Sequence, residues 1–156
     1  MPLAGRVHIA SASNPLEAGR IVSSSLLVSH GVRREALAAV YLEWEGVWLV
    51  ALGSRVRRLW PDADALEGWV KAVLRGARLG AWVEEEIRLS LKGLCVSTGV
   101  RVAEGFESAG LTRVAFYDDA GGVGDCLGKL VVPTPRWLAP AVVNILWDRL
   151  DAELKV

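Results

Sequence analysis

The sequence predicts an α/β fold in which helices flank both faces of a mostly parallel sheet. Short apolar runs alternate along the chain with stretches of helical spacing, which is typical of this class. Several of the apolar runs are continuous, as expected for strands that are covered on both faces. With 156 residues, 52% of them hydrophobic, the chain is long and apolar enough to form one domain spanning residues 1–156.

The first half of the chain is expected to open with a strand at 6–10 and a helix over 18–28. The apolar positions of this helix have a loose helical spacing, and Gly31 can end it by taking the left-handed conformation. An apolar run at 36–43 predicts a largely buried strand. Gly46 lies between two apolar runs, which predicts a hairpin.

The second half is expected to continue this alternation. Residues 55–60 alternate imperfectly between arginine and apolar side chains, which favours an edge strand with an exposed basic face. Asp64 and Glu67 form a capping-box pattern at the start of a helix that reaches Leu79. We interpret 82–91 as a helix because three glutamates would lie near its start, although its later apolar residues alternate like those of a strand. The remaining expected elements are strands at 94–98, 113–117 and 129–132, a short helix at 104–109, and a final helix with Pro140 in its first turn that runs to about Leu154.

The charge of the chain is balanced overall but unevenly distributed. A net charge of zero and a pI near 6.7 exclude a protein that wraps nucleic acid over its whole surface. Residues 1–78 nevertheless hold ten lysines and arginines against seven acidic residues, and arginine outnumbers lysine fourteen to four in the whole chain. Because arginine favours bidentate contacts with phosphate, the basic clusters at 33–34, 55–58 and 75–78 are candidates for phosphate contacts.

The sequence favours a cytoplasmic protein that does not enter a membrane. No segment has the pattern of a signal peptide, and no apolar run approaches the roughly 18 residues that cross a bilayer. Cys95 and Cys126 have no CxxC partner, so neither a metal site nor a disulfide framework is supported. We therefore expect both cysteines to be reduced thiols.

The segment Ser29–Glu35 is expected to contact a ligand. It combines a helix stop, the pair Arg33 and Arg34, and the entry to a buried strand, so the two guanidiniums would project from a fixed scaffold. Paired guanidiniums suit phosphate. The alternative interpretation is a solvated turn that happens to contain two arginines.

The loops at the carboxyl ends of the parallel strands are the second candidate site, because ligands of such sheets bind there. The glycines of 121–128 allow a ligand to approach the backbone closely, but they lack the spacing of a dinucleotide fingerprint, and the segment can equally be a plain connector. Asp125 can act as a base or simply form a turn. Cys126 is interpreted as a small buried hydrophobic side chain rather than a nucleophile.

Three blocks of the sequence resemble the SPOUT methyltransferases, in particular the archaeal enzymes that methylate N1 of pseudouridine in the T-loop of tRNA. Gly19-Arg20 followed by Leu27–Glu35 resembles the family segment GR…LFLSHGIRRD. Residues 53–62 and 93–106 resemble the segments that follow. Towards the end of the chain, the strands and loops at 113–119, 123–125 and 131–140 resemble YLHED, LGDH and SLGPxxYLAS.

The resemblance covers nearly the whole chain and implies a homodimer with a C-terminal trefoil knot that holds S-adenosyl-L-methionine. Relative to the family pattern, the connector between Asp119 and Gly124 is shorter, and Cys126 replaces a histidine. The RNA-binding residues implied by the resemblance are Arg20, His30, Arg33 and Arg34. The implied cofactor-binding residues are Phe116, Gly124, Val131, Val132, Pro133, Thr134, Pro135 and Leu138.

The leading hypothesis is therefore S-adenosylmethionine-dependent methylation of RNA, namely N1 methylation of pseudouridine during tRNA processing. Asp125 is the motif-matched candidate for the base that takes the proton from the attacking nitrogen. The alternative is a non-catalytic RNA-binding or assembly protein with the same fold.

Overall fold

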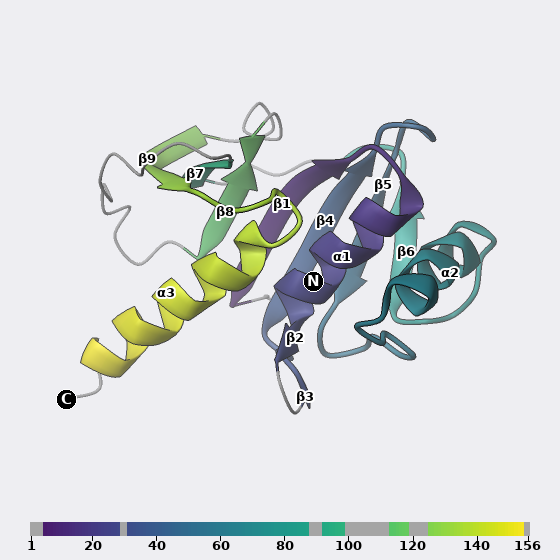
Figure 1. Ribbon diagram of the computed structural model, residues 1–156, viewed down its shortest axis with the longest axis horizontal. Coiled ribbons are helices and arrows are strands. Elements are labelled where there is room, and N and C mark those ends of the chain that lie inside the picture. Colours follow the sequence, from purple (N-terminus) through teal and green to yellow (C-terminus); the bar gives the residue numbers. More distant parts are fainter. Residues whose placement is uncertain (1–4, 29–30, 88–91, 99–112, 119–124, 155–156) are drawn as a thin grey trace.

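The computed structural model describes residues 5–28, 31–87, 92–98, 113–118 and 125–154. Within these ranges the chain forms one seven-stranded sheet, a short two-stranded ladder and three helices (Figure 1). The helices are α1 (Pro15–Leu26), α2 (Ala63–Leu74) and α3 (Ala139–Leu154), and the ladder pairs β2 (Leu27–Val28) with β3 (Gly31–Val32). The order of strands across the sheet is β6 (Ala81–Glu84), β5 (Val47–Leu52), β4 (Ala36–Leu42), β1 (Arg6–Ala12), β8 (Val114–Tyr117), β7 (Lys92–Thr98) and β9 (Asp125–Val132).

The sheet is mostly parallel, as the sequence predicts. Strands β4, β1, β8, β7 and β9 run in one direction, whereas β5 is antiparallel to both β4 and β6. The hairpin predicted at Gly46 joins β4 to β5, and the φ angle of +68° at this glycine suits the tight turn. Helix α1 supplies the long crossover that the parallel neighbours β1 and β4 require.

The three described helices all pack on the same face of the sheet. The helix predicted at 104–109 lies outside the described residues, so helices on both faces stay a prediction. The apolar residues of the described helices join one hydrophobic cluster with every second residue of the strands, including Ala38 and Val40 of β4. The intervening residues, such as Leu37 and Ala39, belong to a second cluster that contains no residue of α1, α2 or α3. Figure 1 shows α1 and α3 in front of the sheet. Continuous apolar runs predict that both faces are buried, but not which elements cover each face.

Helix α1 begins with a well-formed cap and ends earlier than predicted. The side chain of Asn14 accepts a hydrogen bond from the backbone N–H of Glu17 at 2.9 Å, and Pro15 occupies the first turn. The helix ends at Leu26 because the next residue is already extended and enters the β2–β3 ladder. Gly31 is therefore a strand residue, and the predicted left-handed helix stop at this glycine is wrong.

Two elements in the middle of the chain differ from expectation. Residues 55–60 form an irregular loop instead of an edge strand, and Arg58 has a φ angle of +57°, which a strand does not accommodate. The cap of α2 is Asp62, which accepts a hydrogen bond from the N–H of Ala65, so the predicted box at Asp64 is displaced by two residues.

The segment predicted as a helix at 82–91 is instead occupied in its first part by strand β6. This strand pairs antiparallel with β5, and Trp48 lies opposite Glu84. Pairing along the sheet edge outweighs the local preference of the acidic run for a helix start. The rest of this segment beyond residue 87, the predicted helix at 104–109 and most of the glycine-rich connector lie outside the described residues.

The last part of the sheet is stapled by a disulfide that the sequence did not predict. Strand β9 begins at Asp125, four residues earlier than expected, so Cys126 lies on a strand next to β7. Cys95 of β7 and Cys126 of β9 are bonded, with their Cα atoms 5.5 Å apart. The expectation of reduced thiols is wrong because it relied on sequence spacing, whereas the pairing of the two strands brings the cysteines together.

None of the described helices is both long enough and apolar enough to span a membrane.

Candidate functional site

The carboxyl ends of the parallel strands define one edge of the sheet, here called the carboxyl edge (upper edge in Figure 1). It contains the ends of β1, β4 and β8 at Ala12, Leu42 and Tyr117, and the end of β9 at Val132. Loops at this edge are where open parallel sheets bind ligands. Two described segments meet here, namely the turn between β1 and α1 and the connection between β9 and α3.

The connection between β9 and α3, residues 133–138, is called the β9–α3 segment. Its backbone is held by two local hydrogen bonds, from the N–H of Thr134 to the carbonyl of Val132 at 2.8 Å and from the N–H of Leu138 to the carbonyl of Pro135 at 2.9 Å. Pro133 fixes its own φ angle and has no N–H to donate. These two hydrogen bonds and the proline give the segment a defined backbone shape.

Arg136 ties this segment to the end of β1 and the start of α1. Its guanidinium donates to the hydroxyl of Ser11 at 3.5 Å and lies 3.4 Å from a carboxylate oxygen of Glu17. The same carboxylate oxygen accepts from the backbone N–H of Ser13 at 3.0 Å. Sequence reasoning did not single out these residues, although a glutamate three positions after Asn14 is a recognisable helix-start signal.

Arg20 and Trp137 extend the contact between the β9–α3 segment and α1. The guanidinium carbon of Arg20 lies 5.1 Å from the centre of the Trp137 ring, within the range of a cation–π interaction. Arg20, predicted to bind RNA, is therefore placed beside the segment predicted to bind the cofactor.

The side chains of the predicted cofactor residues differ in accessibility. Phe116 is fully buried in the second hydrophobic cluster and Val132 is buried in the first, so neither presents its side chain to a ligand. Val131, Thr134 and Leu138 are half-buried, whereas Pro133 and Pro135 are exposed. Gly124 lies outside the described residues.

Asp125, the predicted catalytic base, lies at the opposite end of β9 from the β9–α3 segment. It pairs in register with Lys92 at the start of β7, whereas Val132 pairs with Thr98 at the other end. At about 3.3 Å per residue, the strand separates the backbone of Asp125 from Pro133 by more than about 20 Å. Within one chain, the structure does not bring the predicted base to the predicted cofactor segment.

The predicted RNA-binding pair lies at the edge opposite the carboxyl edge, here called the amino edge. Arg33 donates from both terminal amino groups to the two carboxylate oxygens of Asp148, each at 3.0 Å, and Arg34 is exposed. Asp148 also accepts from the buried Arg6 at 2.7 Å. His30 lies outside the described residues.

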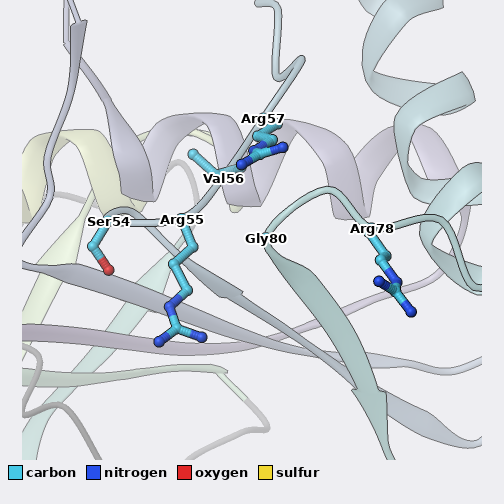
Figure 2. Close-up of a pocket in the computed structure, with 6 residues that line it drawn as sticks. All are labelled: Ser54, Arg55, Val56, Arg57, Arg78 and Gly80. Carbon is cyan, nitrogen blue, oxygen red and sulfur yellow. The ribbon is translucent and has the colours of Figure 1, made fainter.

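A second feature of the amino edge is a cleft of about 630 Å³ lined by three arginines (Figure 2). We call it the three-arginine cleft. The sequence shows basic clusters at 55–58 and 75–78, but only the fold places members of the two clusters around one space. Its lining residues are Ser54, Arg55, Val56, Arg57, Arg78 and Gly80.

No family model matches this sequence, and no curated protein matches it.

Proposed function

We propose that this protein is an S-adenosylmethionine-dependent RNA methyltransferase of the SPOUT type that methylates N1 of pseudouridine in tRNA in the cytoplasm. The observation that carries the proposal is the attachment of the β9–α3 segment to the carboxyl edge. Arg136 joins this segment to both Ser11 and Glu17. The segment that the family resemblance assigns to the cofactor thus lies where parallel sheets bind ligands.

The residues present in the β9–α3 segment suit an adenosyl group. Trp137 and Leu138 of the segment, and Val131 near the end of β9, are half-buried apolar side chains, so they can cover a purine while remaining accessible. The turn fixes the direction of its carbonyl groups, which can accept hydrogen bonds from an amino group. These properties support a nucleoside pocket formed by backbone and apolar surface, with the C-terminal knot implied by the resemblance.

The reaction needs positioning more than acid–base chemistry. The cofactor supplies a sulfonium methyl group that reacts with a nitrogen in line with the carbon–sulfur bond. The nitrogen forms the new bond to carbon, sulfur keeps the electron pair, and the proton leaves the nitrogen for solvent. Asp125 of the same chain does not take this proton, because a whole strand separates it from the β9–α3 segment.

The same separation supports a homodimer as part of this proposal. Arg33 and Arg34 lie at the amino edge, one strand length of about 20 Å from the carboxyl edge, so a second copy of the chain is needed to bring them near a cofactor. The exposed apolar side chains of Val28, Val32 and Ile145 support such an interface. Val28 and Ile145 also line a groove of about 310 Å³ between α1 and α3.

The second candidate is a non-catalytic RNA-binding or assembly protein with the same fold. The position of Asp125 favours it, because the only base that the sequence motif identifies is not at the cofactor segment. Both candidates bind RNA, so binding of the cofactor is what distinguishes them.

The test is to incubate the protein with cofactor labelled on its methyl group and with matched tRNA transcripts that contain uridine or pseudouridine. The enzyme hypothesis expects label only in the pseudouridine transcript. Calorimetry should show micromolar cofactor binding, weakened about tenfold by Arg136→Gln and unchanged by Arg149→Gln, a control on the exposed surface of α3. RNA binding with neither cofactor binding nor methyl transfer would favour the second candidate.

A further inference from the structure

The three-arginine cleft is a well-defined cleft that has no role in the proposed reaction. It forms where the turn after β5 meets the loop that leads into β6, at the amino edge of the sheet. Figure 2 shows the guanidiniums of Arg55 and Arg78 on either side of Gly80. The strand β5 ends at this edge because it is antiparallel to β4.

Backbone contacts hold the two walls of the cleft together. The N–H of Arg57 donates to the carbonyl of Leu79 at 2.8 Å, and the carbonyl of Arg57 accepts from the indole of Trp69 at 2.9 Å. Gly80 has a φ angle of +76°, and a Cβ atom there would collide with the carbonyl oxygen of Arg55. The close approach of the two loops therefore requires glycine at this position.

The three guanidiniums of the cleft have no partner among the described residues. No hydrogen bond or ion pair links Arg55, Arg57 or Arg78 to any described side chain, and no acidic residue lines the cleft. Elsewhere in the described chain, the arginines 6, 33, 113 and 136 are each paired with a carboxylate. Like charges gathered around one cavity raise its positive potential, and an anion that enters relieves their repulsion.

We propose that the three-arginine cleft binds a phosphate group. Guanidinium groups donate paired hydrogen bonds that match the oxygens of phosphate, and three arginines line a space of about 630 Å³ that is open to solvent. The phosphate comes either from an RNA backbone or from a small phosphorylated molecule. This site lies at the amino edge and does not depend on methyl transfer. Phosphate binding can therefore be tested independently of the proposed function.

The first arm of the test uses inorganic phosphate. Nuclear magnetic resonance of the labelled full chain is recorded during a phosphate titration at constant ionic strength, with chloride replaced by phosphate. The amide signals of 54–57 and 78–80 are expected to shift and saturate. The shifts should be lost in the triple variant Arg55→Gln, Arg57→Gln, Arg78→Gln, which removes charge from exposed side chains and leaves the backbone contacts in place. They should persist in Arg149→Gln.

The second arm measures binding of a short fluorescent RNA by anisotropy at several salt concentrations. If RNA supplies the phosphate, the triple variant binds about tenfold or more weakly, and its salt slope falls by about one for each lost phosphate contact. Arg149→Gln should match the wild type. Phosphate binding without an effect on RNA would identify a small phosphorylated ligand as the source. Unshifted amides together with RNA affinity equal to that of Arg149→Gln would overturn the proposal.

Discussion

The imidazole of His8 lies 3.0 Å from the side-chain oxygen of Asn144, and this hydrogen bond joins the first strand of the sheet to the last helix. The amide nitrogen of Asn144 donates to the backbone carbonyl of Ser25 at 3.0 Å, so its oxygen must face His8. His8 therefore donates from Nε2 and accepts at Nδ1 from the hydroxyl of Tyr117, 2.6 Å away. All of these groups are buried, and the neutral imidazole satisfies both of its partners.

The first prediction is that stability falls as the solution is acidified from pH 7.5 to pH 5. The pKa of His8 is lowered from 6.5 to about 3, mainly by burial; the hydrogen bond to Asn144 opposes this shift, and the charges of Arg6 and Arg33 add to it. Between pH 6.5 and about pH 3, the imidazole is protonated in the unfolded chain but not in the folded one. The contribution of His8 to the free energy of unfolding is therefore complete above pH 6.5 and is lost as the pH falls towards 3. We expect a loss of about 2 kcal/mol at pH 5, measured by urea unfolding.

The control for this prediction is His8→Gln. Whatever its baseline stability, the variant should lose most of the slope between pH 7.5 and pH 5, because glutamine does not titrate. Burial raises the pKa of Asp148, but hydrogen bonds from Arg33 and Arg6 lower it below its usual 3.8, so this carboxylate affects stability only at lower pH. A wild-type stability that is flat over this range would contradict a buried neutral His8.

The second prediction concerns three glycines replaced by alanine. Gly68 lies in α2 with open space at its Cβ position, so Gly68→Ala should stabilise the protein by about 0.5–1 kcal/mol. Gly76 has open space but a φ angle of +92°, so its alanine variant should lose about 1–2 kcal/mol. Gly80→Ala adds a backbone collision to a positive φ and should lose more than Gly76→Ala. The measurement is thermal unfolding of all three variants. An equal loss in Gly80→Ala and Gly76→Ala would mean that the structure relieves the backbone collision at position 80.

The third prediction is that reduction of the disulfide destabilises the fold. The bond between Cys95 and Cys126 spans 31 positions, and closing a loop of this length stabilises a protein by about 3–4 kcal/mol in the chain-entropy model. Cys126 is exposed, so a phosphine reductant can reach it. Urea unfolding with and without reductant should show the loss. A variant with both cysteines changed to serine should not respond to reductant, and a response in that variant would point to another cause.

The fourth prediction concerns the carboxylate shared by two arginines at the amino edge. Asp148→Asn keeps the shape of the side chain but removes the charge that contacts Arg6 and Arg33. Because Arg6 is buried, we expect a loss of about 1–2 kcal/mol in the free energy of unfolding. Asp64→Asn on the exposed first turn of α2 is the matched control and should change stability by less than about 0.5 kcal/mol. A loss in the control equal to that in Asp148→Asn would contradict a specific role for the shared carboxylate.

The sequence was sufficient to predict an element where its turn or capping residues agree with its pattern of apolar residues. The strands over 36–42 and 114–117, the hairpin at Gly46 and the final helix were all predicted, because apolar periodicity and turn residues point to the same structure. The sequence failed where pairing with a distant segment decides the outcome. The acidic run after Trp82 resembles a helix start, yet its first part forms strand β6 because it pairs with the edge of β5.

The features of the candidate sites likewise divide into those that the sequence predicted and those that only the fold decided. The chain by itself determined an α/β fold with a mostly parallel sheet, and with it the expectation that ligands bind at the carboxyl ends of the strands, because apolar periodicity is a local property of the chain. Only the tertiary structure joined Arg136 to Glu17, placed Asp125 a full strand away from the β9–α3 segment, and gathered Arg55 and Arg78 around one cleft. These relationships depend on strand order and direction, which bring together residues that are distant in sequence and that no local pattern relates.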